Sequence, residues 1–115
     1  MTPQSLWQRY ARIWSSQASL RTSELEACLT EACVYCDANG VQQGRDALSR
    51  YMGGFQDSVK GGSFEILSVL HHHDRMLAEW RLVGANGAVM QTGRSFATVA
   101  GDGRLQSITG FFDAA

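Results

Sequence analysis

Asp37 is the residue of this 115-residue chain with the clearest potential for chemistry. It stands in the segment CVYCDANG, where Cys33 to Cys36 is strand-prone and Asn39 and Gly40 are turn formers. A carboxylate at the end of a strand can act as a general base if it faces a pocket that limits water. The same carboxylate can instead accept hydrogen bonds from backbone N–H groups in an Asx turn. Both interpretations stay open at this point.

Three consecutive histidines, His71, His72 and His73, are the second group of chemically capable side chains. Imidazole is a common ligand for zinc and related ions. On a strand, however, His71 and His73 share one face while His72 takes the other, and Asp74 is the only acid beside them. The sequence therefore predicts a solvent-facing strand end without a metal. The alternative is that one histidine reaches the mouth of a pocket.

The three cysteines, Cys28, Cys33 and Cys36, form neither an even set nor a spaced disulfide framework. CVYC matches C-x-x-C, but residues three apart on a strand point to opposite faces, so Cys33 and Cys36 cannot easily share a metal or close a bridge. We expect buried, apolar cysteines.

Aromatic and soft side chains could line an apolar pocket with few polar groups, which is the usual character of a small-molecule site. Two positions are open for Arg94. It could face the pocket, where it would orient an anionic ligand or pair with Asp37, or it could face solvent on the outer side of its strand. The predicted lining residues are Trp14, Tyr35, Tyr51, Phe55, Trp80, Met90, Arg94, Phe96 and Phe111.

Three helices are predicted in the first half of the chain. Thr2 and Pro3 indicate the start of a helix that runs to about Gln17, and Ser23 with Glu26 forms a capping box for a short second helix. The third helix opens at 44–46, carries an apolar stripe and ends at the glycine pair 61–62.

The hydrophobic period changes to two after Gly62, which predicts strands. The alternation runs through 63–70 and 76–83, and further strands are expected at 89–100 and 104–112. Asn-Gly at 86–87 and Asp-Gly at 102–103 predict hairpin turns. Helices followed by an antiparallel meander indicate an α+β fold with the helices on one face of the sheet.

Several segments taken together resemble the NTF2-like superfamily, which includes ketosteroid isomerases and SnoaL-like polyketide cyclases. They are CDANGVQQGRDAL, AEWRLVGANG and DGRLQSITGFF, in this order. The resemblance implies an NTF2-like α+β cone in which three N-terminal helices pack on a curved, mostly antiparallel sheet. It further implies one SnoaL-like domain over residues 1–115 and a homodimer, which agrees with the apolar content of both faces of 63–70 and 76–83.

The resemblance also implies a function for Asp37. In ketosteroid isomerases the proton-transferring aspartate closes the segment VEDPVG, and Asp37 in YCDANG occupies the matching place. This implies a cofactor-independent isomerase, cyclase or dehydratase acting next to a carbonyl on a small apolar or carbonyl-bearing molecule. Ala100 stands where the isomerases carry a second aspartate, and Arg94 and Ser95 are nearest to an acid of many SnoaL-like proteins. These departures favour the alternative, a non-catalytic ligand-binding or dimerisation module.

Composition excludes some partners. The 10 Lys and Arg residues nearly balance the 11 Asp and Glu residues, and no basic run offers a track for phosphates, so we expect no nucleic-acid partner. No segment approaches the about 18 apolar residues that a membrane span needs. The first residues, MTPQSLWQRYARIW, lack a basic leader followed by an apolar stretch, which predicts a cytoplasmic protein.

Overall fold

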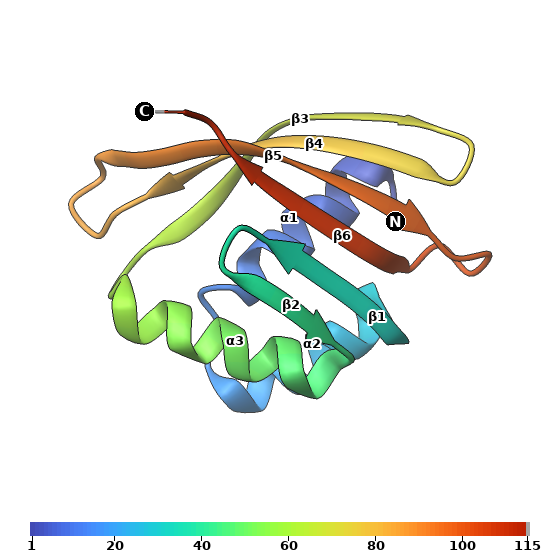
Figure 1. Cartoon of the computed structure of the whole chain (residues 1–115), viewed down its shortest axis with the longest axis horizontal. Helices are drawn as coiled ribbons and strands as arrows, with labels where there is room; N and C mark the ends of the chain where they lie inside the picture. The colour runs from blue at the N-terminus through green and yellow to red at the C-terminus, as the bar shows by residue number, and fades with distance from the viewer. Residues whose placement is uncertain (115) are drawn as a thin grey trace.

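The computed structural model describes residues 1–114, which contain three helices and one six-stranded sheet. Figure 1 shows β3, β4 and β5 arching over α1, while β1 and β2 lie nearer to α2 and α3. The predicted α+β fold, with three helices on a curved and mostly antiparallel sheet, is confirmed. The elements are α1 (Pro3–Ile13), α2 (Ala18–Cys28), β1 (Leu29–Asp37), β2 (Gly40–Gln43), α3 (Arg45–Ser58), β3 (Ser63–His72), β4 (Arg75–Val83), β5 (Val89–Val99) and β6 (Leu105–Phe112).

Helix α1 begins as predicted and ends earlier. The Thr2 side chain accepts a hydrogen bond from the backbone N–H of Ser5 at 3.1 Å, as an N-cap should. The helix ends at Ile13 instead of Gln17 because Ser15 and Ser16 both donate their hydroxyls to the Arg12 carbonyl, which closes the last turn.

The predicted start of the second helix is wrong. Helix α2 begins at Ala18, so Ser23 lies inside it and donates its hydroxyl to the Leu20 carbonyl. Buried Arg21 explains the early start, because its guanidinium donates to the Ser16 carbonyl at 2.9 Å and to Ser49 Oγ at 3.1 Å. Tertiary contacts of this kind outweigh a local capping signal.

The sheet has the order β2-β1-β6-β5-β4-β3, in which the β1–β6 pair is parallel and the other pairs are antiparallel. Strand β2 was not predicted, because GVQQ is only four residues long and carries no clear alternation. It pairs with β1 from Asp37 opposite Gly40 to Val34 opposite Gln43. The turn after Asp37 is therefore a β-hairpin, and β1 and β2 lie between α2 and α3 in the chain.

A β-bulge in β3 changes which side chains face the helices. The pairing with β4 shifts between Ile66 and Ser68, so Leu67 is the extra residue. Beyond the bulge, Val69 pairs with buried Ala78 and packs on the core, whereas Leu70 is exposed. The strict alternation expected through 63–70 is thus wrong after Leu67.

The predicted hairpin turns are confirmed. Gly87 and Gly103 have φ angles of 86° and 88°, which are accessible to glycine at little cost. The β3–β4 turn instead uses His73 at φ 52°, an uncommon conformation for a residue other than glycine.

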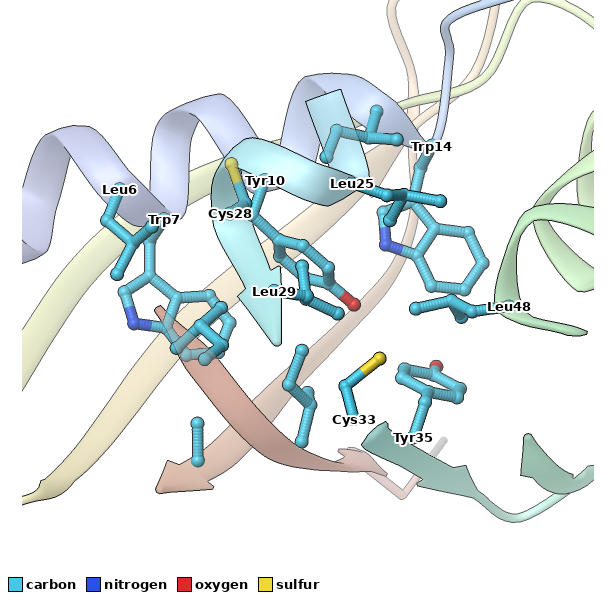
Figure 2. Packing of buried hydrophobic residues seen from close by; sticks show 14 of the residues in the cluster. Leu6, Trp7, Tyr10, Trp14, Leu25, Cys28, Leu29, Cys33, Tyr35 and Leu48 are labelled. Atoms are coloured by element: carbon cyan, nitrogen blue, oxygen red, sulfur yellow. The ribbon is translucent and has the colours of Figure 1, made fainter. Parts of the chain in front are cut away.

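The core lies between α1, α2, α3 and the inner face of the sheet. Figure 2 shows Trp7, Tyr10 and Trp14 projecting from α1 toward the sheet, with Cys33 and Tyr35 rising from β1. The cysteines are unbridged, and Cys28 and Cys33 are buried as expected, while Cys36 is half-buried. Burial raises the pKa of the Cys28 thiol to about 11. Between residues 1 and 114, no helix has the length and apolar character required to cross a membrane.

Candidate functional site

A cavity of about 700 Å³ opens between α1, α3 and the inner face of the sheet. Nine of its 20 lining residues are aromatic, and its volume falls in the range of small-molecule sites. Five of the predicted lining residues do line it: Trp14, Tyr35, Tyr51, Phe55 and Trp80.

Trp14 is the centre of the aromatic wall. Its ring centroid lies 5.4 Å from that of Tyr35, 6.0 Å from that of Tyr51 and 5.6 Å from those of Phe55 and Phe64. The early end of α1 makes Trp14 the C-cap residue, and its ring meets side chains from β1, α3 and β3. Contacts between ring edges and faces of this kind stabilise the packing of the wall.

Asp37 also lines the cavity and accepts several hydrogen bonds there. The Tyr35 hydroxyl donates to Oδ2 at 2.7 Å, and the Tyr51 hydroxyl lies 2.8 Å from both oxygens. The backbone N–H of Asn39 donates to Oδ1 at 2.8 Å. Asp37 is therefore an Asx-turn residue and a cavity carboxylate at once, so the two interpretations of the sequence are compatible.

The tyrosines that face Asp37 are held in the protonated form. Burial, followed by the hydrogen bond to Asp37, raises the pKa of Tyr51 to about 12. Burial is also the largest cause that raises the pKa of Tyr35 and of Tyr10. Tyr10 is fully covered, and within 1–114 its hydroxyl has no hydrogen-bond partner. Tyr35 and Tyr51 consequently act as donors to the carboxylate across the neutral pH range.

Trp80 and Ser95 form a buried polar pair in the sheet. The indole N–H of Trp80 on β4 donates to Ser95 Oγ on β5 at 3.0 Å, and both side chains line the cavity. Gly93 leaves room for this indole, because a Cβ there would lie 2.5 Å from Trp80 Cζ2. The missing side chain at Gly93 thus allows the ring to approach the backbone of β5 closely.

Four predicted lining residues lie outside the cavity: Met90, Arg94, Phe96 and Phe111. The reason is strand alternation: Gly93, Ser95 and Ala97 turn inward on β5, so their neighbours Arg94 and Phe96 face outward. Arg94 takes the outward interpretation and forms ion pairs with Glu79 at 3.2 Å and Asp113 at 3.1 Å.

Other lining residues were missed by the sequence analysis. Phe64 and Ile66 precede the bulge and face inward, which the alternation of β3 could have indicated. Phe112 lines the cavity in place of its neighbour Phe111. The sequence alone does not reveal which of these two adjacent strand residues faces inward. The remaining members include Trp7, Tyr10, Asn39, Arg50, Gln91 and Ser95.

The histidines lie away from the cavity. His71, His72 and His73 are all exposed, and none of them is among the cavity residues. In the part of the chain that the structure describes, no group of three His, Cys, Asp or Glu side chains could hold a metal ion. The histidines therefore contribute no polar group to the cavity, whereas Asp37, the tyrosines and Ser95 do.

Comparison with known proteins finds a family match over most of the chain. The model of the SnoaL-like domain matches residues 7–108. No curated protein matches the chain significantly.

Solved structures share the architecture. One is a protein of the SnoaL-like family from Agrobacterium tumefaciens, named as a proposed isomerase, with a TM-score of 0.91 and 20% identity over 99% of this chain and 100% of that chain. A proposed polyketide cyclase from Sinorhizobium meliloti has a TM-score of 0.73 and 18% identity over 93% and 94%. A Catenulispora acidiphila protein with a ketosteroid isomerase-like fold, solved with trimethylamine, has a TM-score of 0.79 and 14% identity over 98% and 88%. At these identities the likeness shows a common fold.

Proposed function

The chain belongs to the SnoaL-like domain family, and from this premise we propose that its cavity binds a small apolar molecule bearing a carbonyl group. Asp37 then moves a proton at the carbon next to that carbonyl, as an isomerase, cyclase or dehydratase of this fold would require. The observation that carries the proposal is the Asp37 carboxylate at the wall of an aromatic cavity, oriented by Tyr35 and Tyr51.

The surroundings of Asp37 suit a positioned base. Three donors fix both carboxylate oxygens, and they come from β1, from the β1–β2 turn and from α3. Orientation of this kind lowers the entropic cost of proton transfer. Tyr35 and Tyr51 touch the base, so we assign them as positioning residues.

Deuterium exchange tests this function. We choose 2-acetylnaphthalene as a flat apolar ketone with acidic methyl protons and measure by NMR their exchange in D₂O. Wild-type protein should accelerate the exchange. Asp37→Asn should reduce the protein-catalysed exchange rate by about 10²-fold or more, the contribution typical of a general base. Asp102→Asn is the matched control, because Asp102 also accepts the N–H two residues ahead, from Arg104 at 3.0 Å, in an exposed turn.

The outcome against the proposal is equally clear. If the ketone binds and both variants exchange its protons at the wild-type rate, Asp37 is architecture and not a base. The Asp102→Asn variant shows how much change a turn aspartate alone produces on exchange to Asn.

A second candidate is binding of an amine without catalysis. A carboxylate beside aromatic rings also suits alkylammonium ions, through charge and cation–π attraction, and the Catenulispora neighbour was solved with trimethylamine. Arg50, an exposed lining residue, opposes a cation. Calorimetric titration separates the two candidates: tetramethylammonium binding without ketone binding favours the amine.

Assembly forms the last part of the proposal. The outer face of the sheet carries a continuous row of mostly apolar side chains that crosses all six strands, and its large members are exposed in the single chain. Such a face is costly to leave in water, so it pairs with the same face of a second copy. The row consists of Leu70, Leu77, Phe96, Thr109, Cys36 and Val41, each paired with the next.

A further inference from the structure

Gly110 leaves a space beside three residues of the cavity wall, Tyr35, Asp37 and Ser95. It is buried in the middle of β6 and pairs with Ser95 on β5. A Cβ at this position would lie 3.6 Å from Ser95 Oγ, 3.8 Å from Asp37 Cβ and 3.8 Å from the Tyr35 hydroxyl oxygen. A glycine inside a strand often marks the close approach of a ligand. Here three polar side chains surround the space that its missing side chain leaves.

Ser95 is the member of this group whose hydrogen bonding is incomplete. The side chain is buried, with 8% exposure, and its oxygen accepts the Trp80 indole N–H at 3.0 Å. A hydroxyl also carries one proton to donate, and over residues 1–114 no hydrogen bond uses that proton. A buried donor of this kind is costly to leave unpaired. Ser95 lines the cavity, so its proton is available to a ligand there.

We propose that Ser95 donates its hydroxyl proton in a hydrogen bond to the carbonyl oxygen of the ligand, which sits over Gly110 with the adjacent carbon toward Asp37. This inference rests on the proposed function and supplies the oxygen-binding group that the function needs. Ser95 acts as the hydrogen-bond donor to the oxyanion. The space left by Gly110 determines how deeply the ligand oxygen enters the cavity wall.

The chemistry of the step is balanced with these groups. Asp37 takes a proton from the carbon next to the carbonyl, the C–H electron pair forms a C=C bond, and the carbonyl π pair moves to oxygen. The Ser95 hydroxyl stabilises the negative oxygen, and Asp37 then returns the proton to carbon. A donor placed where charge develops stabilises the transition state more than the ground state. The Trp80 N–H polarises the Ser95 hydroxyl and strengthens its donation.

The unpaired Ser95 hydroxyl also predicts which ligands the cavity prefers. A hydrocarbon of the same shape would leave the Ser95 proton unpaired in an apolar cavity, whereas a ketone would satisfy it. Sites that hydrogen-bond a ligand reject the analogue that lacks the polar atom, because the buried group of the protein is then left without a partner.

The test compares 2-acetylnaphthalene with 2-isopropenylnaphthalene, in which a CH₂ group replaces the carbonyl oxygen and the planar shape is kept. Wild-type protein should bind the ketone about tenfold more tightly, a ratio expected for one neutral hydrogen bond. Ser95→Ala should remove the preference, with Ser68→Ala on the exposed outer face as its control. The infrared stretch of the ¹³C-labelled carbonyl should lie at lower frequency in wild type than in Ser95→Ala.

Gly110→Ala tests the space itself. Its Cβ would make only ordinary contacts of 3.6 Å and longer, so the melting temperature should stay near that of wild type. The methyl group would occupy the place of the ligand oxygen, so the ketone should lose its preference over the hydrocarbon. Gly101→Ala is the control, because a Cβ there meets nothing within 4 Å in an exposed turn.

The outcomes separate the two proposals. Equal affinity ratios and an unchanged carbonyl stretch in wild type and Ser95→Ala overturn the role of Ser95 alone. Ketone binding with a lowered stretch but without deuterium exchange overturns the catalytic role of Asp37 and leaves the Ser95 contact standing. Failure of both naphthalenes to bind overturns both. If the Ser95→Ala variant does not fold, the affinity ratio measured on Gly110→Ala and the carbonyl stretch measured in wild type still test the role of Ser95.

Discussion

At the scale of single residues, the main result is that one aspartate combines two roles that the sequence presents as alternatives. Asp37 accepts the Asn39 N–H of its turn and also the hydroxyls of two cavity tyrosines. The turn places the carboxylate, and the tyrosines orient it. The sequence predicted the aspartate, but Tyr51 lies 14 residues away on α3, so this contact depends on how the helix packs.

The tyrosines make a prediction about alkaline pH. The pKa of each of the three tyrosines is raised, that of Tyr51 to about 12, whereas tyrosines of an unfolded chain ionise near their usual pKa of about 10. The folded state therefore binds more protons above pH 10, and its stability falls as the pH rises from 10 toward 12.

Near-ultraviolet titration of tyrosinate absorbance measures this directly. The native protein should show little tyrosinate at pH 10, while the protein in denaturant should show about half of its tyrosines ionised. In Tyr51→Phe the loss of stability above pH 10 should be shallower. A native tyrosine that ionises with a midpoint near 10 would contradict the account.

At the scale of helices and strands, the sequence predicted most of the architecture because periodicity reports which face is buried. The helices, the four long strands and both Gly-containing turns follow from local patterns. The errors have physical causes: buried Arg21 starts α2 early, and the bulge at Leu67 reverses the faces of the second half of β3. Neither the hydrogen bonds of a buried arginine nor an extra residue in a strand pairing leaves a periodic signal.

Strand phase explains how far the site could be predicted. Residues on helices and at the end of β1 were assigned to the cavity by their type, and Trp14, Tyr51 and Phe55 do lie there. Met90 and Phe96 were expected on the cavity side of β5 and do not line the cavity, Arg94 takes the outward position of its two alternatives, and Ser95 was overlooked as a lining residue. The sequence does contain a signal for the inward face of β5. Gly93, Ser95 and Ala97 are small residues at every second position, as expected opposite a bulky ring such as Trp80.

At the scale of the whole molecule, both faces of the sheet carry apolar side chains. The inner face forms the core and cavity, while the outer face exposes Leu70 by 66%, Leu77 by 38% and Phe96 by 39%. These three residues are cross-strand neighbours on β3, β4 and β5. A second copy of the chain would cover them and leave the cavity on the opposite side open to ligand.

The assembly prediction concerns this outer face. Light scattering after size exclusion should give twice the 12.6 kDa of one chain, and Leu77→Lys should give 12.6 kDa because a charge cannot be buried there without a partner. Leu20→Lys, at an exposed leucine of α2 away from the sheet, is the control and should stay dimeric. A wild-type mass of 12.6 kDa would contradict the proposed pairing.

The central claim is that the cavity holds a carbonyl ligand between Asp37 and Ser95, and a crystal structure of the complex with 2-acetylnaphthalene tests it most directly. The account predicts the ketone oxygen at about 2.7–2.8 Å from Ser95 Oγ, over Gly110, with the methyl carbon beside the Asp37 carboxylate. A ketone bound with its oxygen toward solvent, or bound on the outer face of the sheet while the cavity stays without it, would contradict the account.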